Sequence, residues 1–420
     1  MNKCVNFSKS NVSVNWQYVK RNFREMGILT EYLDIFETRA HKAVQELIQS
    51  DIYEEFEEQI GAGKYERAGD ARQDFRKGEY ARFLTTTFGR SEILIPRTQK
   101  GTKIEYSLFE KYQRRQKKFD EMIVMSMILG FSVRKQHKFF KEFLGDAVSH
   151  GTASRLMRTL DNSLSEFRTK KITDEYKYLL VDGIWIHVME SGKVKNRPII
   201  VVMGIKTDNT KEILAFKLTE GETEVAITSV LNDLYRRGLE GKSLKIVASD
   251  GAKGIKAALE NSYPYAKWQL CSTHKLRNLC GHIEQKTKHR KKIMKEASQI
   301  YKSKTRKEAV VRFGKFCRRW ERVEHKAIRL FKKDFEKTLT FYDYSDDRNF
   351  TSTTNHLERD LEEIRRRIKT QGYFKNERSL NYWVYGILKY SERIKQPKGA
   401  PSSPMGEDIK GLEYESVHNS

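Results

Sequence analysis

Two aspartates stand in runs of apolar, strand-forming residues, and glycine follows each of them. Asp182 lies within YLLVDGIWIHV (178–188), and Asp250 ends the run LKIVASD. A buried carboxylate is costly unless it is paired or binds a metal ion. Asp-Gly between two apolar runs is also a strong signal for a hairpin turn. The stretch 178–188 therefore has two interpretations, a hairpin or one continuous strand that carries a functional carboxylate.

A third acid is expected in TSTTNHLERDLEEIRRRIK (351–369), where we predict a helix with Asn355 as its N-cap. Glu358 then occupies the capping-box position, which is the structural alternative for this side chain. Glu362 lies one turn further on the same face, but it can pair with Arg366 at i+4. We therefore choose Glu358 as the third functional carboxylate.

Three converging carboxylates suit the chemistry of phosphodiesters. Neighbouring carboxylates repel each other unless a hard divalent cation neutralises them. Two such metal ions about 4 Å apart can activate a water or a 3′-hydroxyl and stabilise the leaving oxygen. We therefore predict that Asp182, Asp250 and Glu358 bind Mg²⁺ or Mn²⁺ and act on nucleic acid.

The segment from Tyr176 to His274 predicts the elements that would bring the two aspartates together. The pattern of apolar and polar residues predicts the element order β-β-β-α-β-α-β, with an antiparallel meander first and helical crossovers afterwards. The first and fourth strands can then lie parallel and adjacent, so that Asp182 faces Asp250. This α/β order with an acid trio is that of a ribonuclease H-like fold.

The part of the chain before Tyr176 is mainly helical. Residues 13–60 show helical periodicity, whereas 82–97 predicts a β-hairpin. Three short helices are expected between Lys117 and Leu160, with Ser132 and Ser149 as N-caps of the second and third. This pattern fits a helix-turn-helix that reads DNA, although an ordinary helical packing unit is the alternative. The third helix would present Arg155 and Arg158 to DNA.

Positive charge points to a polyanionic partner. The chain has a net charge of +24, and the helical block 272–340 holds 22 Lys and Arg against 7 Asp and Glu. Nucleic acid is the commonest partner for such a balance, although a solvated basic surface is the alternative. Within this block we expect four side chains to contact DNA: Lys275, Arg277, Arg318 and Arg319.

Other features exclude several classes of protein. Four cysteines in 420 residues make a disulfide framework improbable and indicate a reducing compartment. The start MNKCVNFSKS lacks the apolar core of a signal peptide, and the longest apolar run, near 122–131, is too short to span a bilayer. We expect an intracellular protein without a membrane anchor.

The motifs quoted so far resemble, in combination, those of Mutator-type transposases of bacterial insertion sequences, a branch of the DDE transposases. The resemblance runs from about Tyr65 to Tyr390, and its motifs are KYLLVDGIWIHV, RRGLEGKSLKIVASDGAKG, YPYAKWQLCSTHKLRN and TTNHLERDLEEIRRRIKTQGYF. The resemblance implies that Asp182, Asp250 and Glu358 are the catalytic residues. It also implies that 272–345 is a helical insertion ahead of the last acid.

Cys271 and His274 form a Cys-x2-His pair in this region. With Cys280 and His282 they could supply four zinc ligands, but the spacing is irregular for a zinc module. Mutator-type transposases carry such a pair without a required zinc. The resemblance therefore favours a buried contact that supports the edge of the active site. Trp320 is interpreted as a core residue, with stacking on a DNA base as the alternative.

The resulting hypothesis is a DNA transposase that binds the terminal inverted repeats of its element and catalyses strand cleavage and strand transfer. Its rivals are a structure-specific nuclease or resolvase of the same fold and a domesticated regulator without catalysis. Synapsis of two ends implies a homodimer or a larger assembly, and target DNA is the second partner. We expect it in the bacterial cytoplasm, associated with the nucleoid.

This hypothesis divides the chain into six regions. They are a helical region with a hairpin (1–115), a helix-turn-helix region (116–170), the first part of the ribonuclease H-like core (171–271), the basic insertion (272–345), the last core helices (346–395) and a disordered tail (396–420).

Overall fold

The computed structural model describes residues 27–67, 69–108, 114–145, 148–251, 254–284, 289–347 and 352–395. The chain divides into two compact units, one made of Met1–Met122 with His137–Val148 and the other of Ile123–Gln136 with Ser149–Ser420. The tail after Lys395 and the predicted helical residues 13–26 lie outside the described residues.

The first unit contains a long helix and a hairpin. Helix α2 (Gly27–Ile60) is followed by the short turn η1 (Gly69–Ala71) and by strands β1 (Arg76–Thr86) and β2 (Gly89–Thr98). The two strands pair antiparallel from Thr86 and Gly89 outward, which confirms the predicted hairpin. Ile48 and Ile52 of α2 pack against Leu84, Ile93 and Ile95, so the helix covers the apolar face of the hairpin.

The predicted short helices are present as α3 (Lys117–Ile128), α4 (Val133–Leu144) and α5 (His150–Arg158), and α6 (Asp161–Thr169) follows them. The Ser149 hydroxyl accepts the Thr152 N–H at 3.1 Å, which confirms the predicted N-cap of α5. The division between the two units falls within α3, within α4 and between α4 and α5. The helix-turn-helix therefore stays a prediction.

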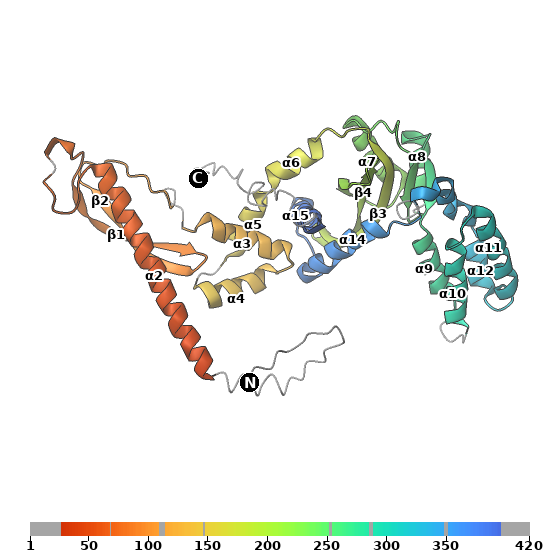
Figure 1. The fold of residues 1–420 in the computed structure, drawn as a ribbon, viewed down its shortest axis with the longest axis horizontal. Helices are drawn as coiled ribbons and strands as arrows, with labels where there is room; N and C mark the ends of the chain where they lie inside the picture. The colour runs from red at the N-terminus through yellow and green to blue at the C-terminus, as the bar shows by residue number, and fades with distance from the viewer. Residues whose placement is uncertain are drawn as a thin grey trace. The chain divides into compact units, whose positions relative to one another are not determined.

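One mixed sheet organises the second unit (Figure 1). Its strands are β3 (Tyr176–Glu190), β4 (Lys193–Lys206), β5 (Lys211–Leu218), β6 (Ile246–Ser249) and β7 (Lys267–Leu270). The order is β5-β4-β3-β6-β7. Strands β3, β4 and β5 are antiparallel neighbours, whereas β3, β6 and β7 run parallel. The predicted meander and the parallel pairing of the first and fourth strands are confirmed.

Asp182 lies inside a continuous strand. It pairs with Val201 in a β3–β4 ladder that continues beyond it to Glu190 and Lys193, so the hairpin interpretation of Asp182-Gly183 is wrong. Residues 176–182 are all buried. A strand that is buried along such a run is covered on both of its faces.

Helices supply that cover. Helices α7 (Glu224–Arg236) and α8 (Ile255–Ser262) pack on β3, β4 and β6 through a cluster that includes Ile227, Leu231, Leu259, Val181 and Val247. Helix α14 (Asn355–Ile368) packs on β3, and α15 (Glu377–Lys395), which follows the turn η4 (Lys369–Gln371), contacts β5. These last helices were predicted at nearly the same residues.

The basic block between β7 and α14 is helical, as predicted. It comprises α9 (Ser272–His282), α10 (Arg290–Tyr301), α11 (Arg306–Trp320), α12 (His325–Lys332) and the turns η2 (Phe335–Thr338) and η3 (Thr340–Asp347). These elements form their own apolar core. Trp320 is buried in it, and its indole N–H donates to Glu296 Oε2 at 2.7 Å, which confirms a core position. No described helix is both long and apolar enough to cross a membrane.

Candidate active site

Asp182 and Asp250 meet at the carboxyl end of β6. Val181 pairs with Ser249 in the parallel register of β3 and β6, so the next residues along the two strands, Asp182 and Asp250, are adjacent. Neighbouring strands lie about 4.8 Å apart. Asp182 is only 6% exposed, and its Oδ1 accepts the Gly183 N–H at 2.8 Å. The sheet register thus brings the two predicted carboxylates together.

The environment of Asp182 disfavours its charged form. Burial raises the pKa of Asp182, and the neighbouring charges of Asp250 and Glu358 raise it further. His274 and the Gly183 N–H act in the opposite direction, and the resulting pKa is about 6. Excess negative charge on oxygen atoms fits a hard divalent cation, which would remove the repulsion. The donor set is therefore suitable for Mg²⁺ or Mn²⁺.

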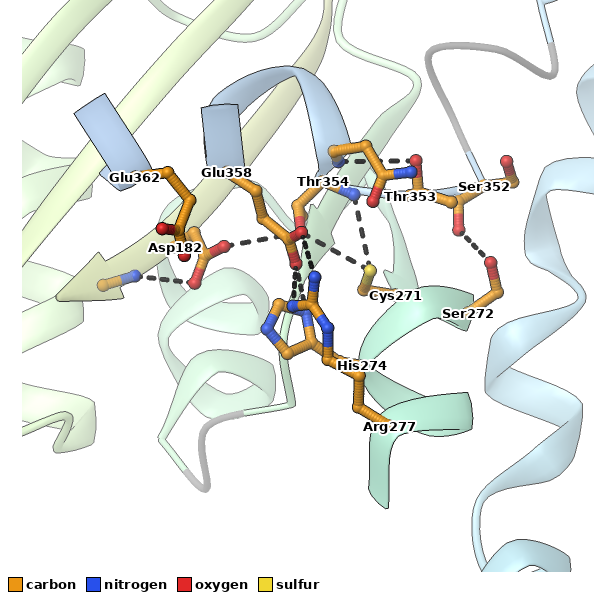
Figure 2. Close-up of polar contacts among 12 residues, drawn as sticks. Asp182, Cys271, Ser272, His274, Arg277, Ser352, Thr353, Thr354, Glu358 and Glu362 are labelled. Atoms are coloured by element: carbon orange, nitrogen blue, oxygen red, sulfur yellow. Dashed lines mark hydrogen bonds and ion pairs between the residues drawn. The ribbon is translucent and has the colours of Figure 1, made fainter. Parts of the chain in front are cut away.

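Glu358 projects from the first turns of α14 toward α9 (Figure 2). Its two carboxylate oxygens accept hydrogen bonds from the Arg277 guanidinium at 2.7 and 2.8 Å. His274 Nδ1 lies 3.3 Å from Glu358 Oε1. A bidentate pair of this kind is the strong, directional form of a charged hydrogen bond. Arg277 and His274 therefore hold the Glu358 carboxylate, and the charge of this carboxylate raises the pKa of Asp182.

Two local predictions for α14 are wrong. The residue before the helix is Thr354 rather than Asn355, and its side chain makes no capping hydrogen bond. Glu358 therefore does not occupy a capping box, because its carboxylate binds Arg277 instead. Glu362 pairs with Arg365, not with Arg366, whose partner is Glu363. Both pairs use the i+3 spacing on an exposed helix face.

Cys271 and Ser272 join the end of β7 to the start of α14. The Cys271 sulfur accepts hydrogen bonds from the backbone N–H and the hydroxyl of Thr354, both at 3.4 Å. Ser272 donates to the Ser352 carbonyl from its N–H at 3.1 Å and from its hydroxyl at 2.9 Å. The Thr354 hydroxyl also lies 3.5 Å from Asp182 Oδ2. Figure 2 shows these contacts beside Asp182 and Glu358.

His274 carries positive charge into this cluster. Burial lowers the pKa of His274, but a hydrogen bond with Cys271 and the charges of Cys271, Asp182 and Glu358 raise it to about 9. A protonated imidazole has no lone pair to offer a metal ion. At neutral pH, His274 therefore acts as a counter-charge for the neighbouring carboxylates.

The four-ligand zinc alternative does not assemble. Among the described residues, ligand atoms of Cys271, His274 and Glu358 lie within 4.8 Å of one another, and Cys280 and His282 do not belong to that group. Cys280 accepts a hydrogen bond from Arg290, and His282 Nδ1 lies 2.7 Å from the Asn278 carbonyl oxygen. Structural zinc sites are closed by four ligands.

We therefore expect the purified protein to contain no stoichiometric zinc. The group of Cys271, His274 and Glu358 has no fourth zinc ligand among the described residues, because Cys280 contacts Arg290 and His282 contacts the Asn278 carbonyl. Elemental analysis of protein purified without chelators measures this directly. About one zinc per chain would contradict the expectation.

The predicted DNA-contacting residues fall into two groups. Arg155, Arg158, Arg277, Arg318 and Arg319 are exposed. Lys275 is buried instead, and its ammonium donates to the carbonyls of Leu330 and Lys333 at the end of α12. This geometry favours a structural role for Lys275. Cations at the end of a helix stabilise its unpaired carbonyls.

One carboxylate near the aspartates was not predicted. Glu222 lies between β5 and α7, and burial together with the charge of Asp250 raises its pKa. Its side chain is half-buried, and it stands between two other glutamates in the sequence TEGETE. Nothing local distinguishes Glu222 from its neighbours, so only the three-dimensional arrangement reveals it.

Comparisons with known proteins identify the family of this chain. A family model described as "Transposase, Mutator family" matches residues 20–395, so the chain belongs to the Mutator family of transposases. It is 30% identical over 339 residues to the transposase for insertion sequence element ISRM5 of Rhizobium meliloti, covering 80% of this chain and 84% of that protein. It is also 30% identical over 361 residues to the transposase for IS256 in transposon Tn4001 of Staphylococcus aureus, covering 79% and 88%.

Proposed function

We propose that this chain is a DDE transposase that cleaves and joins DNA at the ends of an insertion sequence. The single observation that carries the proposal is the convergence of Asp182, Asp250 and Glu358 from β3, β6 and α14, in a chain of the Mutator transposase family. The relatives named above are transposases for insertion sequence elements.

The topology supports a ribonuclease H-like catalytic domain. An antiparallel meander followed by two parallel strands, in the order β5-β4-β3-β6-β7, is the arrangement expected for that fold. The segment α9–α12 interrupts the domain between β7 and α14, as a helical insertion ahead of the last acid would.

Each residue of the site then has a role. Asp182, Asp250 and Glu358 would hold the divalent ions, which when bound supply activation of the attacking hydroxyl and stabilisation of the leaving oxygen. Cys271 and Thr354 fix the start of α14, so they position Glu358. His274 and Arg277 balance the carboxylate charge before metal ions and DNA arrive. The reaction would be hydrolysis at the element end, followed by attack of the exposed 3′-hydroxyl on target DNA.

DNA recognition is assigned to the helices around α5 and to the basic insertion. The exposed Arg155 and Arg158 suit contacts to the terminal inverted repeat, and Arg318 and Arg319 suit phosphates of the flanking DNA. Pairing of two element ends requires at least two copies of the protein.

A cleavage assay tests this function. Full-length protein is incubated with Mg²⁺ and a labelled duplex that carries the terminal repeat and flanking DNA of its element. We expect a strand cut at the repeat boundary that leaves a 3′-hydroxyl, and no cut in a shuffled duplex. A protein that binds this duplex without cutting it would support the regulator instead, and cutting governed by branch structure would support the resolvase.

Arg155→Ala is expected to weaken binding to the terminal repeat by about 1–3 kcal/mol if Arg155 contacts a base edge. Arg236→Ala is the matched control, because Arg236 is an exposed arginine on α7, away from the predicted reading helix. Gel shifts at several salt concentrations measure both variants. Equal affinity of Arg155→Ala and Arg236→Ala would remove Arg155 from the interface.

A further inference from the structure

Glu222 shares a small cavity with two of the candidate catalytic acids. The three acidic residues Asp182, Glu222 and Asp250 line this cavity, and its remaining lining is mostly apolar: Val181, Gly183, Ile200, Ile227, Ser249 and Ile255. The three acids come from β3, the loop before α7 and the end of β6, so the fold rather than the local sequence brings them together.

Gly183 makes room for the Glu222 carboxylate. A Cβ atom on Gly183 would lie 3.1 Å from Glu222 Oε1, which is tighter than ordinary van der Waals contact. Gly183 lies in the regular β3–β4 ladder and has no positive φ, so its backbone does not require glycine. The missing side chain instead lets the Glu222 carboxylate approach the backbone of β3 at the residue that follows Asp182. Trp185 donates a hydrogen bond that orients Glu222 from the same strand.

Helix α7 does not explain the position of Glu222. The N-cap of α7 is Thr223, whose hydroxyl accepts the Ala226 N–H at 3.3 Å. Glu224 already supplies an acid in the first turn, where it complements the helix dipole. Glu222 therefore has no capping duty, and its carboxylate faces the cavity rather than the helix.

We propose that Glu222 is a fourth metal ligand of the active site, acting together with Asp182 and Asp250. This inference rests on the proposed metal-dependent function. Each bound Mg²⁺ needs one or two carboxylates in addition to phosphate and water oxygens. Glu358 does not line this cavity, because it lies beside α9 with Arg277. Two ions with up to two carboxylates each can use four carboxylates, and Glu222 would be the fourth beside the predicted trio.

Binding of Mn²⁺ to the full-length protein without DNA tests the proposal apart from activity. Free Mn²⁺ is measured by electron paramagnetic resonance for the wild type, Glu222→Gln, Glu224→Gln and Asp182→Asn. Glu222→Gln should weaken binding of one ion by at least about 10-fold, the lower end of the losses seen when even an outer partner of a metal site is removed. Glu224→Gln is the control, because Glu224 is exposed and lies two residues away.

Gly183→Ala provides a second variant that keeps all four carboxylates. Its added methyl group displaces Glu222 Oε1, so it should also weaken Mn²⁺ binding. Circular dichroism melting checks that each variant is folded.

The outcomes separate this inference from the proposed function. If Asp182→Asn loses Mn²⁺ while Glu222→Gln and Gly183→Ala bind it like the wild type, Glu222 is not a ligand and the proposed function stands. If Asp182→Asn also binds like the wild type, the metal site fails and the inference falls with it. In the expected case, Glu222→Gln also needs a higher Mg²⁺ concentration for half-maximal cleavage.

Discussion

Neutralising any one of Asp182, Asp250 and Glu358 should reduce strand cleavage by at least about 10³-fold while DNA binding persists. Asp182→Asn, Asp250→Asn and Glu358→Gln keep the shape of each side chain but remove a charge that a divalent ion requires. Loss of one stabilising group at a reacting centre already costs about 10²–10³ in rate. Loss of a metal ligand impairs both activation of the nucleophile and stabilisation of the leaving group.

Binding should survive because the exposed basic residues are untouched by these changes. Affinity for DNA should be unchanged or higher, since each variant removes a negative charge that repels phosphate. Gel shifts of the three variants on the same duplex give this comparison. A parallel loss of binding and cleavage would indicate misfolding, which melting curves would reveal.

Asp182→Asn should also make the metal-free protein more stable at neutral pH. Burial, mainly, and the charges of Asp250 and Glu358 raise the pKa of Asp182 from 3.8 to about 6. His274 lowers it, but only partly offsets these effects. At about 1.4 kcal/mol per pKa unit, the ionised Asp182 costs the folded state about 3 kcal/mol. Asparagine keeps an acceptor for the Gly183 N–H without the charge.

The pH dependence follows from the direction of this shift. Because the folded state binds the Asp182 proton more tightly than the unfolded state, this group favours folding below about pH 4. That contribution is lost as the pH rises to about 6 and is absent above it. In the presence of a chelator, Asp182→Asn should therefore have a higher melting temperature than the wild type at pH 7.5. The difference in melting temperature should be smaller at pH 4.5. A wild type that melts higher at pH 7.5 would contradict the account.

Sequence patterns predicted the sheet because its signals are local and repeated. Long β-branched runs, N-cap residues and short crossovers fix β3, β6 and the helices between them, and the parallel register then brings Asp182 beside Asp250. The Asp182-Gly183 pair was ambiguous for a physical reason. Glycine permits a turn, but it equally leaves space for another carboxylate, and only the structure shows that Glu222 fills it.

The partners of α14 could not be predicted because they are distant in sequence. Glu358 fits a capping box on spacing alone, yet its bidentate partner Arg277 lies 81 residues earlier. Lys275 looks like any other cation of the basic block, but packing against the end of α12 buries it. Charge counts over a segment do not reveal which cations face inward.

Single-turnover cleavage by Glu358→Gln, compared with Glu362→Gln, tests the central claim most directly. Both changes remove one carboxylate from α14, one helical turn apart. Glu362 is exposed and pairs with Arg365, so its loss should cost at most a few tenths of a kcal/mol. With Mg²⁺ and the terminal-repeat duplex, the account predicts cleavage at nearly the wild-type rate by Glu362→Gln and none detectable by Glu358→Gln. The reverse result, or normal cleavage by both variants, would contradict it.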